Sequence, residues 1–559
     1  MMTEGLRTVG SVLDSLVPRA DFDRVPDWPP DVFAITATLL NETETFLLVV
    51  SPPEGRMWPP TPRWAAMVRE AGQAWSGRLG EEAAPRPELL ADCWRRLGEA
   101  RDVPLGELTR GERWTVCVAV LTLHALADEA CAGLGSPGRN LPGSFEQQAW
   151  RRLRETGSLS RFPTSRVKVA PKTHLTLGGI NLRSLSRHLA SYTSHVEVSW
   201  GQASTGRSAE QPEPDPTYSV LLLPWPPVVR AGDFRRTDGP LVEMGRAGFG
   251  FFQFDPQQPL DLGYVEAALQ AALRETPQVD LVLLPEAAVL PDELEQLEEL
   301  VARYGVLSLT TGVREPARSE ADLGRNYAHM GLWSDGRWQR AQVDKHHRWS
   351  LDAGQIRQYH LSGVLPPQKR WWEAISIPRR RLHVLDMEDV GPIAVLICED
   401  LSRLDAVSEV LRFVGPTLVL ALLQDGPQLA TRWSSRYAGV LADDPGSAVL
   451  TLTSLGMARR CRPPGSRPSR VIALWKDPDR GQREIEMAQG AQAVLLGLEK
   501  QRQATWTADG RSHEEGTPRL VLERVTQIYT TRSSTHPADG ARATGSRKAC
   551  REALPQPAA

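Results

Sequence analysis

The sequence predicts an α/β domain from about residue 218 onward, preceded by a mainly helical N-terminal part. Five short apolar runs are typical of strands that are buried on both faces. They are YSVLLLP (218–224), VDLVLLPE (279–286), GVLSLTTGV (305–313), GPIAVLICED (391–400) and PTLVLALLQD (416–425). Between the second and third runs, PDELEQLEELVARYG has apolar residues at helical spacing. The resulting order of strand, helix and strand indicates an α/β domain.

Residues 1–200 are predicted to form a mainly helical domain, whose role the sequence does not indicate. Apolar residues recur at spacings of three and four in four segments. These are TPRWAAMVREAGQAW (61–75), PELLADCWRRLGEA (87–100), GERWTVCVAVLTLHALADEA (111–130) and SFEQQAWRRLRE (144–155). Residues 33–50, rich in Thr, Leu and Val, instead predict a short β-hairpin around Asn41 and Glu42.

Two polar segments predict the domain boundaries. GQASTGRSAEQPEPDPT (201–217) contains no large apolar residue and is interpreted as a linker between two independently folding units. The α/β domain is expected to cover residues 218–510. The rest, 511–559, is rich in Thr, Ser, Gly and charge and is predicted to be a disordered tail.

The composition excludes several classes of function. The net charge of −3 gives no basic excess, so we expect no nucleic-acid partner. We also expect neither a signal peptide nor a membrane span, because no apolar run approaches the roughly 20 residues that a spanning helix needs. The six cysteines lie far apart, without the spacing of a metal site, which favours a reducing, cytoplasmic setting and no metal.

Three reactive side chains lie at or just beyond predicted strand ends. Glu286 ends VDLVLLPE, Lys345 follows the alternating stretch WQRAQVD, and Cys398 ends GPIAVLIC. Each alone is more often a solvated or core residue. Lysine is rare here, however, at seven of the 65 basic residues. A cysteine nucleophile needs a base and a positive group near the developing oxyanion, which these three residues can supply together.

The order of the three motifs LLPE, DKHH and ICED resembles that of the nitrilase, or carbon–nitrogen hydrolase, superfamily. ICEDLS is similar to the glutamine-amidase domain of NAD synthetases, and DKHHRWSLDAGQI is similar to nitrilase-like domains of bacterial defence systems. The resemblance covers about residues 218–498. It implies a four-layer α-β-β-α nitrilase-like sandwich, association into at least homodimers, and a Cys-Glu-Lys triad that hydrolyses a small amide or nitrile through a thioester. It implies no cofactor.

The same resemblance suggests roles for residues around the triad. The backbone N–H of Glu399 would help to stabilise the oxyanion, and Asp400 would hold the turn at Cys398. His346 would line the rim of the pocket. In TLTSLGM, Ser454 stands where the family has an asparagine.

The sequence departs from the family pattern in two ways. The family usually has a second glutamate between the Lys and the Cys, but here the matching stretch has Gln355, with Asp352 nearby and Glu373 well downstream. The phosphate loop of NAD synthetases is absent, which excludes NAD synthesis. The alternative hypothesis is therefore a weak or inactive nitrilase-fold scaffold in a bacterial defence or signalling assembly, with the N-terminal domain recruiting a protein partner.

Five other motifs are interpreted as structural. LADD (441–444) lacks the surroundings of a polymerase site, and the adjacent His346 and His347 point to opposite faces of a strand rather than to one metal. WWEAI (371–375) is interpreted as core packing. The basic clusters RRR (379–381) and ARRCR (458–462) are interpreted as solvated faces, although a phosphate could bind them.

Overall fold

The computed structural model describes residues 7–16, 24–79, 86–134, 143–175, 179–203, 216–237, 248–317, 323–334, 336–377, 380–387, 390–463 and 465–530. These residues form a mixed α/β structure with several sheets and helices. No described helix has both the length and the apolar character that crossing a bilayer requires.

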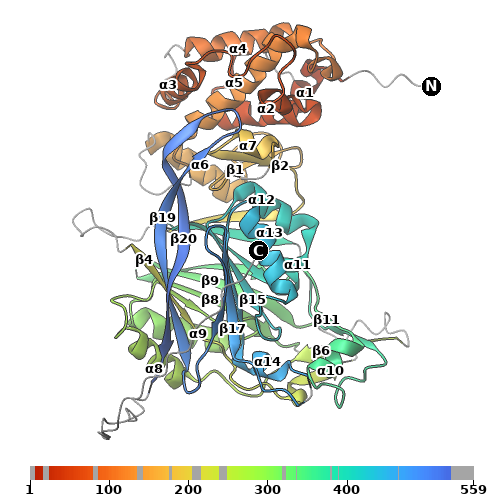
Figure 1. Cartoon of the computed structure of the whole chain (residues 1–559), viewed down its shortest axis with the longest axis vertical. Helices are drawn as coiled ribbons and strands as arrows, with labels where there is room; N and C mark the ends of the chain where they lie inside the picture. Colours follow the sequence, from red (N-terminus) through yellow and green to blue (C-terminus); the bar gives the residue numbers. More distant parts are fainter. Residues whose placement is uncertain are drawn as a thin grey trace, which may run out of the picture.

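Helices dominate the first 160 residues. The α-helices there are α1 (Val9–Leu16), α2 (Pro29–Thr43), α3 (Trp64–Ser76), α4 (Glu88–Glu99), α5 (Trp114–Ala130) and α6 (Gly143–Thr156). Two short strands, β1 (Lys168–Pro171) and β2 (Leu189–Tyr192), pair antiparallel beyond them, with the short helix α7 (Leu182–Leu185) between. Figure 1 shows this part at one end of the molecule.

The predicted hairpin at residues 33–50 is wrong, because α2 runs to Thr43 and a 3₁₀ turn covers Thr45–Val49. Most residues of α2 are buried, and the helix therefore has apolar side chains around nearly its whole circumference. Its threonines fit the helix by donating back to carbonyls one turn earlier, as Thr36 does to Val32 at 2.9 Å. A helix buried all round has no polar face to reveal its period.

Two seven-stranded sheets form the larger part of the molecule. The first has the order β10-β9-β8-β7-β4-β19-β20 and the second the order β18-β17-β16-β15-β14-β13-β3. The strands of the first are β4 (Thr217–Leu222), β7 (Leu281–Leu283), β8 (Ser308–Glu315), β9 (Arg325–Ser334), β10 (Arg337–Asp344), β19 (Ala493–Trp506) and β20 (Ser512–Ile528). Those of the second are β3 (Glu197–Ala203), β13 (Arg381–Met387), β14 (Gly391–Ile397), β15 (Leu418–Leu423), β16 (Ala448–Thr453), β17 (Val471–Asp477) and β18 (Gly481–Glu486).

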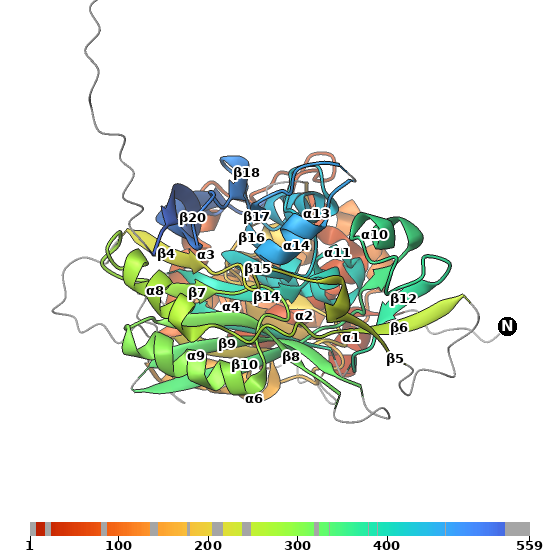
Figure 2. The same cartoon turned by 90° about the horizontal axis from the view of Figure 1, so that it is seen from below.

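The two large sheets share one buried core, to which Val220 and Met330 of the first sheet and Val395 and Leu420 of the second belong. Helices α8 (Leu262–Ala272) and α9 (Pro291–Arg303) pack in a separate core on the first sheet. On the side of the second sheet lie α11 (Glu399–Ser402), α12 (Glu409–Val414), α13 (Trp433–Asp443) and α14 (Leu455–Arg460) (Figure 1; α11, α13 and α14 also in Figure 2).

A four-stranded sheet lies beside the larger ones. Its order is β11 (Ser350–Leu351), β12 (Arg370–Glu373), β6 (Phe249–Phe254) and β5 (Phe234–Thr237). Helix α10 (Ala353–Gln358) follows β11, and aromatic residues including Phe234, Phe252 and Trp349 make its core. Trp371 of the WWEAI motif is buried in this core, while Glu373 of the same motif faces the site described below.

Both predicted boundaries need correction. Residues 201–203 of the predicted linker belong to β3, which pairs in parallel with β13, and Thr217 already begins β4. The predicted tail includes β20, which pairs along its length with β19. The rest of each segment, 204–215 and 531–559, lies outside the described residues.

The N-terminal part and the sheets are joined rather than independent. The β19–β20 hairpin extends from the first sheet to the helical part (Figure 1), where the buried Arg511 bonds Asp128 at 3.0 Å and Glu129 at 2.8 Å. Residues of α2 and α5 also belong to the same core as the two large sheets. The expectation of two independently folding units is therefore wrong, because their apolar surfaces are buried against each other.

Candidate active site

A lysine lies between two glutamates where three strands end. Lys345 follows β10, Glu286 lies just beyond β7, and Glu373 ends β12. The ammonium nitrogen of Lys345 is 2.7 Å from Oε1 of Glu286 and 2.6 Å from Oε2 of Glu373. All three side chains are buried. A buried cation with two carboxylates is held in one position, because leaving either charge unpaired is costly.

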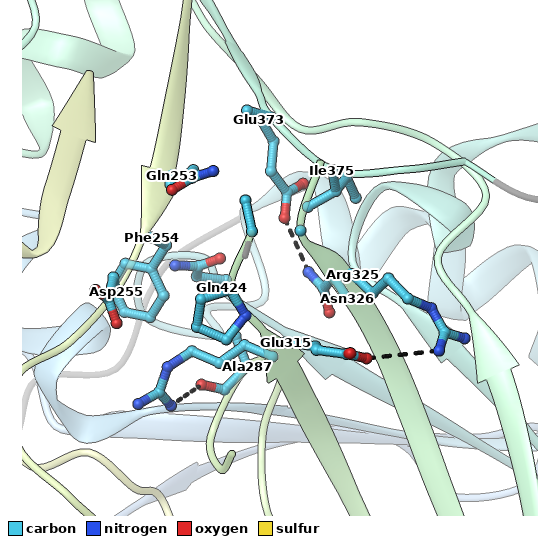
Figure 3. Close-up of a pocket in the computed structure, with 15 residues that line it drawn as sticks. Gln253, Phe254, Asp255, Ala287, Glu315, Arg325, Asn326, Glu373, Ile375 and Gln424 are labelled. Carbon is cyan, nitrogen blue, oxygen red and sulfur yellow. Dashed lines mark hydrogen bonds and ion pairs between the residues drawn. The ribbon is translucent and has the colours of Figure 1, made fainter. Parts of the chain in front are cut away.

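An asparagine fixes the two carboxylates relative to each other. The side-chain amide of Asn326, on β9, donates to Glu286 at 2.8 Å and to Glu373 at 2.9 Å. Figure 3 shows the bond to Glu373. The backbone carbonyl of Asn326 also accepts a hydrogen bond from the backbone N–H of Lys345 at 3.0 Å. Sequence reasoning missed Asn326, since an asparagine near the start of a strand carries no signal of its own.

The backbone at Glu286 depends on a glycine in the neighbouring strand. Ala287, which follows Glu286, has a φ of 54°, and the turn lies against Gly312 of β8. A Cβ at Gly312 would lie 2.4 Å from Cα of Glu286, well inside van der Waals contact. Only glycine therefore allows the turn that presents Glu286 to approach the strand so closely.

Cys398 lies on a strained turn between β14 and α11. Its φ of 43° is rare for a residue other than glycine, and such strain is often found at functional sites. The turn is held by a bond from the N–H of Cys398 to the carbonyl of Leu422 at 2.8 Å and by one from Leu401 to the carbonyl of Cys398 at 3.0 Å. The N–H of Glu399, at the start of the helix, has no acceptor within that helix.

Asp400 links the turn at Cys398 to the loop after Lys345. Its carboxylate accepts from the backbone N–H of His346 at 3.1 Å and contacts Nδ1 of His347 at 2.8 Å. Nε2 of His346 lies 3.0 Å from the backbone carbonyl oxygen of Arg381. His346 and Asp400 thus connect the two loops that bring Lys345 and Cys398 to one place.

Burial and charge set the protonation of the cluster. Burial opposes the positive charge of Lys345, but Glu286 and Glu373 outweigh it and hold the lysine pKa well above its usual range. Burial raises the pKa of Glu286, and Lys345 counteracts the rise. Burial and the nearby Glu286 raise the pKa of the Cys398 thiol, against the influence of Lys345. The raised pKa favours the neutral thiol of Cys398, and Glu286 is the carboxylate with the largest effect on that pKa.

A cavity of about 480 Å³ leads to Cys398. Asp425 in its wall is held by Arg432 at 2.7 Å, by Nε1 of Trp433 at 2.9 Å and by the hydroxyl of Tyr359. Arg436 also lines the cavity and has no carboxylate within ion-pair distance among the residues that the structure describes. The lining is thus polar and aromatic.

A second cavity, of about 30 Å³, lies at the other side of the cluster, against Asn326 and Glu373 (Figure 3). It is large enough for about one or two water molecules and too small for an organic substrate. Of these two cavities, only the one at Cys398 is large enough to admit an organic substrate.

The other predicted residues lie around this centre. Asp352 and Gln355 cap α10 reciprocally, and Gln355 also lines the cavity at Cys398. Neither forms an ion pair with Lys345, and Glu373 is the second acid that does. Ser454 caps α14 by accepting from the N–H of Met457 at 3.1 Å.

Comparisons with known proteins add little to this geometry. No family model matches the chain, and no curated protein sequence matches it. Among solved structures, the chain is similar to Saccharomyces cerevisiae Nit3, a member of branch 10 of the nitrilase superfamily. The identity is 16%, the match covers 51% of this chain and 90% of that one, and the TM-score is 0.32. It is also similar to the C. elegans NitFhit protein, at 14% identity, 48% and 61% coverage and a TM-score of 0.31. TM-scores this low carry no argument, so function is inferred from the residues.

Proposed function

We propose that this protein is a carbon–nitrogen hydrolase of the amidase or nitrilase type, on a nitrilase-like four-layer sandwich. One observation carries the proposal. Lys345 is buried between Glu286 and Glu373, and Cys398 lies on a strained turn that a solvent cavity reaches. An ion pair with a purely structural role would require neither a nearby cysteine nor a solvent-accessible cavity that leads to that cysteine.

The reaction proceeds through a thioester. Glu286 takes the proton of the Cys398 thiol as the sulfur attacks the carbonyl or nitrile carbon of the substrate. Lys345 and the N–H of Glu399 stabilise the negative charge that develops on the attacked group. For an amide, Glu286 returns the proton to the leaving amine and the thioester forms. For a nitrile, the proton goes to the nitrile nitrogen, and the resulting thioimidate adds water and loses ammonia to give the same thioester. Water then attacks the thioester with Glu286 as the base, the carbon–sulfur bond breaks, and Glu286 returns the proton to the sulfur of Cys398. The scheme uses no metal and no organic cofactor.

Glu373 acts as a positioning residue in this scheme. Its carboxylate contacts Lys345 and also accepts from the backbone N–H of Trp349 at 3.1 Å, so it fixes the ammonium group relative to the β11 loop. Two sequence features favoured an inactive scaffold: the absence of a glutamate at Gln355 and the large N-terminal part. Glu373, on β12, supplies a second acid at Lys345, so the first of these features no longer favours the scaffold.

The cavity limits the class of substrate. Its volume of about 480 Å³ fits a small amide or nitrile rather than a folded polypeptide. Arg436 can pair with an anionic group on the substrate, because no carboxylate of the described chain occupies it. We therefore expect amides that also carry a carboxylate to be the better substrates.

The setting of the enzyme follows from the same proposal. We expect it to act in the cytoplasm, to form at least a homodimer, and to contact any protein partner through its N-terminal helices.

Release of ammonia from a panel of small amides and nitriles tests the proposal. The wild type is expected to release ammonia from at least one member, and Lys345→Arg to lose about 10²–10³ of the turnover. The larger, planar guanidinium cannot take the place of a compact ammonium group. Lys476→Arg, on a half-buried lysine of β17, is the matched control and should keep full activity. Failure of the whole panel, or a folded and fully active Lys345→Arg protein, would overturn the proposal.

A further inference from the structure

A further cavity, of about 320 Å³, lies beside α14, and three arginines line it. Arg459, Arg460 and Arg462 belong to the ARRCR motif, and they share the cavity with Val228 and His360. Arg459 and His360 are exposed and Val228 is 48% exposed, so the cavity opens to solvent. None of these residues lines the cavity at Cys398.

The positive charge in this cavity is not neutralised within the described chain. No carboxylate there lies within ion-pair distance of the three guanidinium groups, whereas the partly buried Arg432 pairs with Asp425 and the buried Arg511 with Asp509. Asp233 lies beyond ion-pair distance of Arg460, although its negative charge still favours the charged form of that arginine. The carboxylate of Asp233 instead accepts a hydrogen bond from the backbone N–H of Arg230 at 2.7 Å.

Backbone carbonyls hold two of the arginines in place. Arg460 donates to the carbonyls of Val229 at 3.2 Å and of His360 at 2.8 Å, and Arg462 donates to the carbonyl of Ser466 at 3.3 Å. Carbonyl dipoles orient a guanidinium group without cancelling its charge. His360 itself has a φ of 53°, a strained conformation for a residue other than glycine.

Three arginines that line one cavity favour a ligand with several anionic oxygens. A planar guanidinium group can donate two parallel hydrogen bonds to two oxygens of one phosphate. Such charge-assisted hydrogen bonds are stronger than hydrogen bonds between neutral groups. The cavity is large enough for a phosphate with a small organic group, and the exposed side chain of Val228 offers that group an apolar contact.

We propose that this arginine-lined cavity binds a small phosphate-bearing molecule, at a site separate from the cavity at Cys398. The two sites share a wall, because Tyr359 lines the cavity at Cys398 and the next residue, His360, lines the arginine-lined one. The proposal does not depend on the hydrolase activity.

Calorimetric titration of the full-length protein with inorganic pyrophosphate at low ionic strength tests this inference. We expect saturable binding at concentrations below about 10 mM. Arg459→Gln should weaken it by about tenfold or more, and Arg459→Gln with Arg462→Gln by considerably more. Arg56→Gln removes one positive charge from an exposed position in the N-terminal part and should leave binding unchanged. Circular dichroism of each variant checks the fold.

Two results would overturn the proposal. One is a failure of pyrophosphate binding, either because no saturable binding occurs below about 10 mM or because the folded Arg459→Gln, Arg462→Gln double variant binds as well as the wild type. The other is a tighter affinity for citrate than for pyrophosphate, which would show a carboxylate site instead of a phosphate site.

Discussion

The ammonium nitrogen of Lys345 lies 2.6 Å from Oε2 of Glu373, although the two residues are 28 positions apart and lie at the ends of strands in different sheets. Lys345 is fully buried and Glu373 nearly so. The pairing therefore joins the first large sheet to the four-stranded sheet at the candidate active site. It also makes the stability of the protein sensitive to a residue that we propose for catalysis.

Glu373→Gln should destabilise the protein, because it leaves Lys345 with one carboxylate in a buried place. Breaking a buried ion pair typically costs about 3–5 kcal/mol. Glu286 and Asn326 remain, so we expect the lower end, about 3 kcal/mol, in the free energy of unfolding by urea. Glu315→Gln, which removes a partly exposed partner of Arg325 at 3.5 Å, is the control and should cost less than about 1 kcal/mol. Equal effects of the two changes would contradict the buried pairing.

Gly312→Ala should displace the turn that carries Glu286. The added Cβ would meet the backbone of Glu286 and Ala287 at 2.4–2.5 Å, and backbone cannot move as a flexible side chain can. We expect a loss of about 1–3 kcal/mol of stability, as for overpacked sites, together with a loss of turnover. Gly439→Ala lies within α13, where a Cβ meets no atom within 4 Å, and should be neutral or slightly stabilising. A Gly312→Ala protein as stable as the wild type would show that the approach is not this close.

Arg511→Met should weaken the attachment of the β19–β20 hairpin to the N-terminal helices. The change leaves Asp128 and Asp509 buried without their cation, which costs about 3–5 kcal/mol. The measurement is urea unfolding, followed by circular dichroism for the helices and by tryptophan fluorescence. Arg480→Met, at an exposed arginine of the turn between β17 and β18, is the control and should leave the urea midpoint almost unchanged. Independent unfolding of two units in the wild type would contradict the joint core.

Stability should fall on acidification below about pH 6.5, because buried histidines resist protonation. Burial lowers the pKa of His124 and His174 to about 3, and that of His188 and His383 to about 4. The unfolded chain, with histidine pKa values near 6.5, then binds more protons than the folded one, so unfolding becomes easier as the pH falls. Each histidine should contribute about 1.4 kcal/mol per pH unit between about pH 6 and 4. Urea midpoints that stay constant from pH 7 to 5 would contradict this.

The residues at the centre of the proposed site carry a clearer signal in the sequence than those around it. Glu286, Lys345 and Cys398 were visible because each follows or ends a recognisable strand. Glu373 was considered only as a distant alternative, because what brings it to Lys345 is the pairing of β12 with β6 and β11, which no local pattern reveals. Gln355 was nearer in sequence, but capping of α10 uses its side chain.

The errors in the fold have a related cause. Residues 512–519 (SHEEGTPR) are almost entirely polar, and they belong to a strand only through the pairing of β20 with β19. Read alone, such a polar segment is hard to distinguish from a tail. The α2 helix gave the opposite error, because burial on nearly all sides removed the polar face that identifies a helix.

The role of Cys398 as the nucleophile is the central claim, and the rate of ammonia release by Cys398→Ala tests it most directly. Cys461→Ala is the matched control, because Cys461 is also buried, close to Arg432 at 3.5 Å. The account predicts that Cys398→Ala, folded by circular dichroism, loses about 10⁴ or more of the turnover of the best substrate, as when a nucleophile is removed, while Cys461→Ala stays active. A folded Cys398→Ala protein that releases ammonia at the wild-type rate would contradict it.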